Sequence, residues 1–135
     1  MYLLDTNILS EMTRKRPDAH VRNRLVRTAV EDCHSSVICR YELRYGALLR
    51  EDGPAFWNRL QSEILGLATW LPVTAPIADL AASLAATLER KGHGLDTHDL
   101  LIASTALDHD LTLITRNTKH FTRIPSLRIE NWFEP

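Results

Sequence analysis

Short apolar runs alternate along the chain with longer segments in which apolar residues recur every three to four positions. A short apolar or β-branched run between polar clusters predicts a strand, and the three-to-four spacing predicts a helix. The runs predict strands at residues 2–4, 34–38, 70–73, 111–115 and 127–130. The longer segments predict helices over residues 8–12, 21–30, 40–49, 56–65, 77–88 and 99–107. Because strands alternate with helices and no repeat or linker interrupts them, the sequence predicts a single α/β domain over residues 1–135.

An acid follows the first predicted strand directly. This residue is Asp5, with Thr6 and Asn7 beside it. In an open parallel α/β sheet, ligands bind outside the carboxyl ends of the strands, where Asp5 would lie. The same residue is equally suited to cap the helix that follows. The stretch alone leaves both roles open, so the decision depends on whether other acids reach the same edge of the sheet.

Two further acids are predicted at that edge. Glu42 lies one turn into the helix after the second strand, where an acid near a helix N-terminus is also favourable to the helix dipole. Asp99 opens a nearly all-apolar helix, with Asp96 three residues earlier as the expected N-cap. A charge at the mouth of a buried helix is costly without a partner, so capping explains Asp96 better than Asp99. Asn117 follows the fourth strand, where asparagine is also common as a turn residue.

Three carboxylates in one pocket repel one another and raise each other's pKa values. A hard divalent cation removes that cost, because Mg²⁺ or Mn²⁺ takes oxygen ligands, keeps waters and bridges to substrate phosphates. Such an ion activates water for attack on phosphorus. The sequence therefore predicts a metal site of Asp5, Glu42 and Asp99. The expected auxiliary polar groups around it are Thr6, Asn7, Ser36, Asp96, Thr115 and Asn117.

Composition narrows the class of protein without identifying a partner. Apolar residues make up 44% and charged residues 24% of the chain, as in ordinary globular domains. A net charge of −1 gives no overall sign of nucleic-acid binding, so a polyanion would need a local patch or metal ions. No apolar run approaches the ~20 residues of a membrane span, and a strand beginning at Tyr2 leaves no room for a signal peptide. Cys33 and Cys39 flank a buried strand, which fits reduced core thiols and a cytoplasmic location.

Four motifs, in order, resemble the signatures of PIN-domain ribonucleases. They are Leu3-Leu4-Asp5-Thr6-Asn7, Tyr41-Glu42-Leu43-Arg44-Tyr45-Gly46, Asp99-Leu100-Leu101-Ile102-Ala103 and Leu113-Ile114-Thr115-Arg116-Asn117 with the residues that follow. The closing segment, residues 124–132, is similar to the C-terminus of VapC toxins of type II toxin–antitoxin systems. The resemblance implies a three-layer α/β/α fold with a five-stranded parallel sheet in the order 3-2-1-4-5. The edge position that this order gives the third strand agrees with Pro72, which cannot donate to a neighbouring strand.

The resemblance also implies an activity and a partner. It implies a Mg²⁺-dependent endoribonuclease, with Mn²⁺ as a substitute, that is neutralised by a cognate VapB-like antitoxin. Asp5, Glu42 and Asp99 would be the metal-binding carboxylates. Many members of the family have a fourth acid where this chain has Asn117, which weakens the case for a second metal, and Asp96 is a possible replacement. The candidate RNA contacts are Arg14, Lys15, Arg16, Arg22 and Arg116.

Other hypotheses remain open at this point. An Asp after a strand is also found in phosphatases that form an aspartyl-phosphate, but these usually have a second Asp where this chain has Asn7. A catalytically inert binding module would use the acids as caps and would have no metal affinity. Zinc ligation by His93, Asp96 and His98 is disfavoured by the Gly-containing loop and the absence of a nearby cysteine pair. A homodimer or the antitoxin is expected to use the apolar stripe of Phe56, Leu60 and Ile64.

Overall fold

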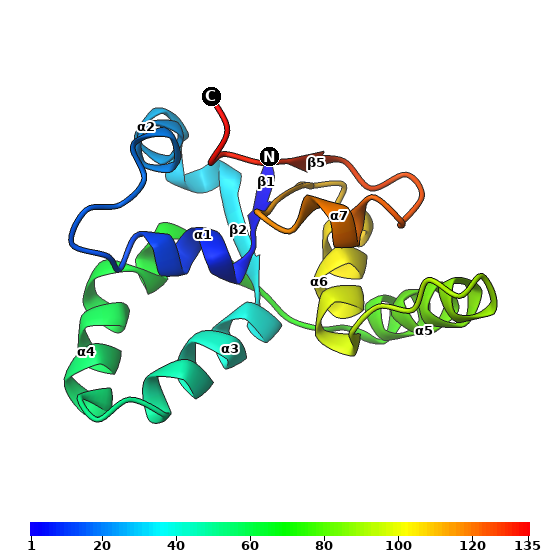
Figure 1. The fold of residues 1–135 in the computed structure, drawn as a ribbon, viewed down its shortest axis with the longest axis horizontal. Helices are drawn as coiled ribbons and strands as arrows, with labels where there is room; N and C mark the ends of the chain where they lie inside the picture. Colours follow the sequence, from blue (N-terminus) through cyan, green and yellow to red (C-terminus); the bar gives the residue numbers. More distant parts are fainter.

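A computed structural model describes all of residues 1–135, and its centre is a five-stranded sheet (Figure 1). The strands pair in the order β3-β2-β1-β4-β5, and every pairing is parallel. The predicted α/β fold and strand order are therefore confirmed, including the edge position of the third strand. The strands are β1 Tyr2–Leu4, β2 Cys33–Ser36, β3 Thr69–Leu71, β4 Thr112–Ile114 and β5 Ile129–Glu130.

Seven α-helices surround the sheet. They are α1 Thr6–Glu11, α2 Ala19–Arg27, α3 Val37–Leu48, α4 Gly53–Glu63, α5 Ala75–Arg90, α6 Thr97–Asp108 and α7 Thr118–Phe121. Two 3-10 helices, Val30–Asp32 and Leu65–Leu67, precede β2 and β3. None of the helices combines the length and the apolar character that a membrane span requires.

Alternation along β1 divides the core into two layers. Leu3 packs with apolar residues of α5 and α6, whereas Leu4 packs with those of α1, α2, α3 and α4. Figure 1 shows these two helix groups on opposite sides of the sheet. Both leucines are fully buried, as expected for a central parallel strand that is covered on both faces. The residue after Leu4 therefore leaves the middle of the sheet from a rigid, buried position.

Several element boundaries differ from the sequence prediction. The second strand ends at Ser36, and Val37 and Ile38 already belong to α3, because the Ser36 hydroxyl accepts the Ile38 N–H at 3.0 Å and caps the helix. The second helix ends at Arg27, so Ala29 and Val30 lie outside it. The short helix α7 was not predicted, because four residues give no periodic pattern to detect.

Two of the three residues in the apolar stripe of the fourth helix, which was expected to serve a partner, belong to the core. Leu60 is fully buried and Ile64 is 3% exposed, and both pack in the core beneath β1. Leu48, expected to pack, is instead 62% exposed. The exposed apolar side chains of α3 and its C-cap are Val37, Tyr41, Tyr45, Leu48 and Leu49. These residues offer a partner more apolar surface than Leu60 and Ile64 do.

Candidate active site

The pairing of β1 with β4 fixes the first acid of the site. Leu4 lies opposite Ile114, so the next residues, Asp5 and Thr115, leave the sheet side by side. The Asp5 N–H donates to the Ile114 carbonyl at 2.9 Å. The Thr115 hydroxyl donates to Oδ2 of Asp5 at 2.8 Å and accepts the N–H of Asn117 at 3.0 Å. Because Thr115 is fully buried and Asp5 is 4% exposed, this contact is shielded from water.

Asp5 has both of the roles that the sequence left open. Its Oδ1 accepts the N–H of Thr6 at 2.7 Å, which caps α1. The Asn7 amide donates to its Oδ2 at 3.3 Å. The hydrogen bonds from the Thr6 N–H and the Thr115 hydroxyl orient the carboxylate at the edge of the sheet. Asp5 is thus a helix cap and a pre-oriented acid at the same time.

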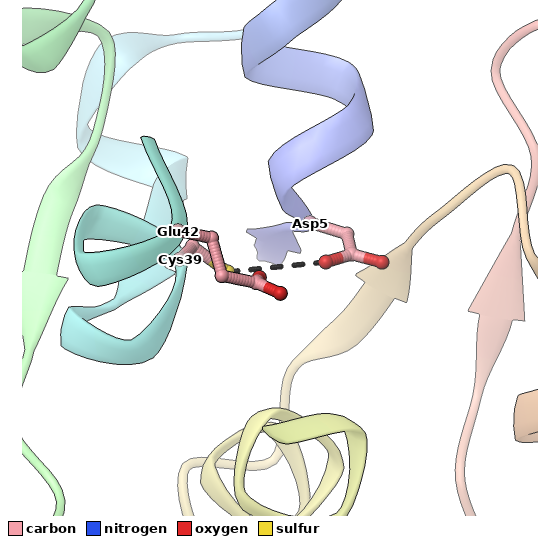
Figure 2. Close-up of side chains that lie close together, drawn as sticks. All are labelled: Asp5, Cys39 and Glu42. Atoms are coloured by element: carbon pink, nitrogen blue, oxygen red, sulfur yellow. Dashed lines mark hydrogen bonds between the residues drawn. The ribbon is translucent and has the colours of Figure 1, made fainter. Parts of the chain in front are cut away.

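The second acid comes from α3. Glu42 accepts a hydrogen bond from the Thr6 hydroxyl through Oε1 at 2.6 Å, which ties α3 to the start of α1. One turn earlier, the Cys39 sulfur lies 3.9 Å from Oδ1 of Asp5 (Figure 2). One ligand atom from each of Asp5, Cys39 and Glu42 can be chosen so that all lie within 4.8 Å of one another. Cys39 was predicted only as a core residue, although its spacing of three residues from Glu42 places both on one face of the helix.

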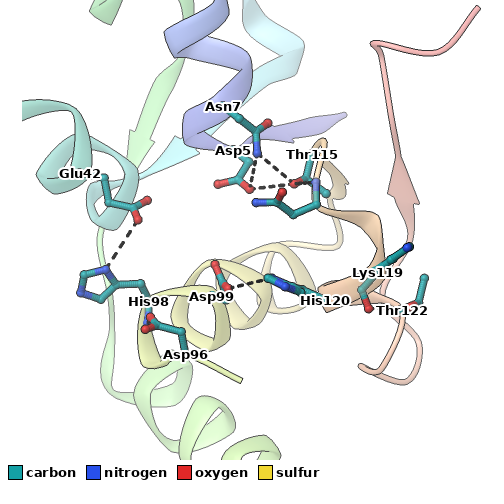
Figure 3. Close-up of polar contacts among 11 residues, drawn as sticks. Asp5, Asn7, Glu42, Asp96, His98, Asp99, Thr115, Lys119, His120 and Thr122 are labelled. Carbon is teal, nitrogen blue, oxygen red and sulfur yellow. Dashed lines mark hydrogen bonds and ion pairs between the residues drawn. The ribbon is translucent and has the colours of Figure 1, made fainter. Parts of the chain in front are cut away.

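The third acid opens α6. The Asp96 side chain accepts the N–H of His98 at 2.7 Å, which confirms it as the N-cap, and Asp99 follows in the first turn. Figure 3 shows the carboxylates of Asp5, Glu42 and Asp99 facing a common space. These acids come from three separate elements. The ligand atoms that lie within 4.8 Å of one another belong to Asp5, Cys39 and Glu42, and Asp99 is outside that group.

Two histidines lie on the open side of the site. The Nδ1 of His98 is 3.7 Å from Oε2 of Glu42, and the Nδ1 of His120 is 3.7 Å from Oδ2 of Asp99. In the sequence, His98 is a candidate only for a zinc site, and His120 shows no spacing typical of a ligand. The pattern of the sequence could not show the position of His120, because it depends on the unpredicted helix α7.

Burial and charge set the ionisation of the acids. Desolvation raises the pKa of Asp5 from 3.8 to about 6, opposed by the hydrogen bonds from Thr115 and Thr6 and assisted by the charges of Glu42 and Asp99. Desolvation also raises the pKa of Asp99, with Asp96 as the next cause. The hydrogen bonds from Thr115 and Thr6 therefore offset only part of the cost of burying the charge of Asp5.

The donor set fits a hard divalent cation. Burial and the charge of Asp5 raise the pKa of Cys39 to about 12, which disfavours a thiolate ligand at this position. The remaining donors are carboxylate oxygens, which suit Mg²⁺ or Mn²⁺. The side chains of Glu42 and Asp99 are 32% and 23% exposed, so water can reach the space between the acids. A cation here would offset the burial and repulsion that raise the pKa of Asp5.

The other predicted site residues divide into those that support the acids and those that do not. Thr6, Asn7 and Thr115 contact the carboxylates directly, as expected. Asn117 contributes its backbone N–H to Thr115, whereas its exposed side chain forms no hydrogen bond within the protein. His93, Asp96 and His98 are not among the residues whose ligand atoms lie close enough to share a metal, so the structure gives the zinc hypothesis no support.

The candidate RNA contacts do not form one patch. Arg14, Lys15 and Arg16 are exposed in the bend after α1, and Arg22 is exposed on α2. Only Arg116 adjoins the acids, because its N–H donates to Oδ1 of Asn7 at 3.2 Å. Its guanidinium lies 4.4 Å from the centre of the Phe133 ring, a cation–π contact that fixes the side chain.

Comparison with known proteins identifies related sequences over nearly the whole chain. The family model of the PIN domain matches residues 2–127. The chain is 33% identical to ribonuclease VapC2 of Rickettsia felis over 132 residues, which covers 98% of each chain. It is 36% identical to toxin FitB of Neisseria gonorrhoeae over 126 residues, which covers 90% of this chain and 91% of that one.

Solved structures agree with the fold. The structure of FitAcB from Neisseria gonorrhoeae superimposes with a TM-score of 0.90 at 32% identity, covering 100% of both chains. VapBC2 from Rickettsia felis, solved bound to a DNA fragment from its promoter, superimposes with a TM-score of 0.86 at 33% identity, covering 97% of this chain and 98% of that chain. A further neighbour, with a TM-score of 0.77, 27% identity and full coverage of both chains, is described as a toxin–antitoxin complex from Klebsiella pneumoniae.

Proposed function

The chain belongs to the PIN-domain family, and on that basis we propose that it is a Mg²⁺-dependent endoribonuclease that acts as a toxin of the VapBC type. Its relatives carry the names ribonuclease VapC and toxin FitB over at least 90% of this chain. The observation that carries the proposal is the convergence of Asp5, Glu42 and Asp99 at the carboxyl edge of the sheet. The charges of Glu42 and Asp99 help to raise the pKa of Asp5, and such repulsion is costly unless a cation is bound among the acids.

The chain's own residues hold and orient the site. Asp5, Glu42 and Asp99 would hold the ion. When bound, it would supply activation of water and stabilisation of charge on the phosphate. Thr115 and Thr6 fix the oxygens of Asp5 and Glu42, so the carboxylates need not reorganise when substrate arrives. Asp5 must lose its proton to act as a ligand, which its raised pKa opposes below about pH 6.

The residue beside Asp5 counts against an aspartyl-phosphate mechanism. The position of the second acid is taken by Asn7, whose amide donates to Asp5 at 3.3 Å and cannot act as a general acid or base. An inert binding module would use the acids only as caps. It predicts no affinity for Mg²⁺, so metal titration followed by thermal unfolding separates it from the enzyme.

The test of the function is cleavage of RNA by the purified protein with and without Mg²⁺. We expect cleavage that EDTA abolishes and Mg²⁺ or Mn²⁺ restores. Because water rather than the ribose 2′-hydroxyl is the proposed nucleophile, end-labelling should find 5′-phosphate and 3′-hydroxyl ends. Products with 2′,3′-cyclic phosphates would contradict the mechanism. We expect the substrate to be an RNA loop, whose unstacked bases a protein can read, and sequencing of cleaved 5′ ends from cells would locate it.

An antitoxin would reach the site along a groove. A pocket of about 330 Å³ between α1, α3 and α4 has Glu42 in its lining, together with Ser10, Gly46, Arg50 and Phe56. We propose that an extended antitoxin segment lies here and places an arginine among the carboxylates. The guanidinium would form charge-assisted hydrogen bonds with them and compete with Mg²⁺.

Co-expression with the product of the neighbouring gene tests this arrangement. Alanine substitution of arginines in the tail of that protein should restore ribonuclease activity, and Mg²⁺ should weaken the complex. Inhibition that is undiminished by the substitutions and by Mg²⁺ would contradict the arginine contact. Homodimerisation stays a prediction, which light scattering of the purified protein would test; the exposed apolar residues of α3 offer it a surface.

A further inference from the structure

A second pocket adjoins the acids on the side away from the groove. It measures about 280 Å³, and none of its lining residues is hydrophobic. The β4–α7 connection and α7 form one wall, and the C-terminal turn forms the other. The lining residues that carry the argument are Arg116, Asn117, Lys119, His120, Asn131 and Glu134.

Two residues that line the pocket also connect it to the acids Asp99 and Asp5. His120 lines it, and the Nδ1 of this residue is 3.7 Å from Oδ2 of Asp99. Asn117 also lines it, and its N–H donates to the Thr115 hydroxyl that in turn donates to Asp5. Figure 3 shows His120 between Asp99 and Lys119. A chain bound at the acids could therefore continue into the pocket without crossing another element.

The walls of the pocket are held in place before any ligand binds. Trp132 is fully buried and anchors the C-terminal turn. Within that turn the Asn131 side chain accepts the N–H of Phe133 at 3.0 Å. The guanidinium of Arg116 lies 4.4 Å from the centre of the Phe133 ring. Contacts that hold Asn131 and Arg116 before binding reduce the conformational entropy that these two side chains lose when a ligand binds.

We propose that this pocket binds one unstacked nucleotide of the RNA strand beside the bond that is cut, with guanine as the preferred base. The inference rests on the proposed ribonuclease function and specifies where its selectivity arises. The volume is at the low end for ligand pockets, which suits a single nucleotide rather than a longer segment.

The polar groups match the two parts of a nucleotide. Lys119 and Arg116 are exposed cations in a chain of net charge −1, and they supply the local positive charge that a phosphate requires. The carboxylate of Glu134 is an acceptor with two oxygens, and guanine presents two adjacent N–H donors on its Watson–Crick edge. The Asn131 amide can donate to the guanine O6. Adenine, cytosine and uracil do not offer this pair of adjacent donors.

Binding of short RNAs tests the pocket independently of cleavage. The probes are nine-nucleotide oligouridines that carry guanine, adenine or cytosine at the centre, together with the all-uridine strand. An Asp5→Asn background prevents hydrolysis, and fluorescence anisotropy gives the dissociation constants. We expect the guanine strand to bind about tenfold more tightly than the others, and Glu134→Gln to remove that preference. Lys119→Ala should weaken all strands alike and reduce the salt slope by about 0.7, the value for one phosphate contact on a single strand.

Matched variants at the far end of α5 control for charge. Glu89→Gln and Lys91→Ala carry the same changes on exposed residues outside the pocket, and they should leave both the preference and the slope unchanged. Equal binding of all strands by the parent, or a preference that survives Glu134→Gln, would overturn the proposal. If guanine-selective binding is present but the protein with native Asp5 cleaves no RNA, the ribonuclease function is wrong and the nucleotide pocket stands.

Discussion

Asp5 and Asp99 belong to one site, but the protein holds them in opposite ways. Asp5 is 4% exposed and accepts hydrogen bonds from Thr6, Thr115 and Asn7. The side chain of Asp99 is 23% exposed, and the Nδ1 of His120 lies 3.7 Å from its Oδ2, beyond hydrogen-bond distance. Glu42 is intermediate, with one short bond from Thr6 and a histidine at 3.7 Å.

The difference separates two tasks of a cation site. On the enclosed side, Thr115 fixes the geometry of Asp5, and burial makes the charged carboxylate unfavourable. A bound cation should therefore stabilise this side most. The open side, Asp99 and Glu42 with their histidines, stays accessible to water and to a substrate strand. Substitutions of Asp5 or Thr115 should therefore have larger effects on ion binding and cleavage than substitutions of the histidines on the open side.

The largest effect is expected for Asp5→Asn. The amide keeps the shape and can still cap α1, but it is not an anionic ligand. Loss of a partner that merely orients a ligand costs about 10–100-fold, so loss of the ligand itself should reduce RNA cleavage by more than about a hundredfold. Asp79→Asn on the exposed face of α5 is the matched control and should cleave like the parent. Parent-like cleavage by a folded Asp5→Asn protein would make Asp5 a cap only.

The next effect is a dependence of stability on pH. In metal-free buffer, the folded protein keeps the Asp5 proton up to about pH 6, whereas the unfolded chain releases it near 3.8. The folded state therefore binds more protons in this window, and the stability of the parent falls as the pH rises through it. At about 1.4 kcal/mol per pKa unit, the loss has an upper limit of about 3 kcal/mol.

Asp5→Asn lacks this titration, so it isolates the contribution. In urea unfolding with EDTA between pH 4 and 7.5, the free energy of unfolding of the variant should increase relative to that of the parent as the pH rises. Saturating Mg²⁺ at pH 7.5 should then restore the stability of the parent and leave the stability of the variant unchanged, because only the folded parent binds the ion. A difference between the two proteins that is constant with pH would mean that the buried carboxyl of Asp5 ionises without cost.

A smaller effect is expected for Thr115→Val, which removes the hydroxyl and keeps the volume. Asp5 loses its 2.8 Å hydrogen bond, and the N–H of Asn117 loses its acceptor. Metal affinity should fall about tenfold, at the low end of the range for groups that orient a ligand. Thr115→Ser restores the hydroxyl and should recover most of the affinity. Isothermal titration with Mn²⁺ measures both, and equal affinities for the valine and serine variants would show that Thr115 only fills space.

The sequence predicted the enclosed side of the site better than the open side. Asp5 and Thr115 are set by strand ends, and parallel pairing brings strand ends together wherever apolar runs reveal the strands. Cys39, His98 and His120 depend on how helices pack against that edge, which apolar spacing does not determine. The boundary at Ser36 shows the same limit, because β-branched Val37 and Ile38 favour a strand locally but the serine cap begins the helix there.

The smallest effect is expected on the open side, for His98→Gln. The imidazole Nδ1 is 3.7 Å from Glu42, and both side chains are at least 32% exposed, so the pair is loose and screened by water. Exposed charge pairs contribute about 0.2–1 kcal/mol, so cleavage should change by less than about fivefold. His98 also makes an edge-to-face contact with Tyr41, at 5.5 Å between ring centres. The methylene groups of a glutamine can still pack against Tyr41.

His109→Gln at the opposite end of α6 is the matched control, because this histidine also faces a partly exposed acid, Asp108, at 3.9 Å. Steady-state cleavage should place both variants within a fivefold range of the parent. A hundredfold loss for His98→Gln, with normal folding and normal Mn²⁺ affinity, would contradict the division between the two sides. His98 would then act on the substrate itself, and the open side would contribute to the reaction as strongly as the enclosed one.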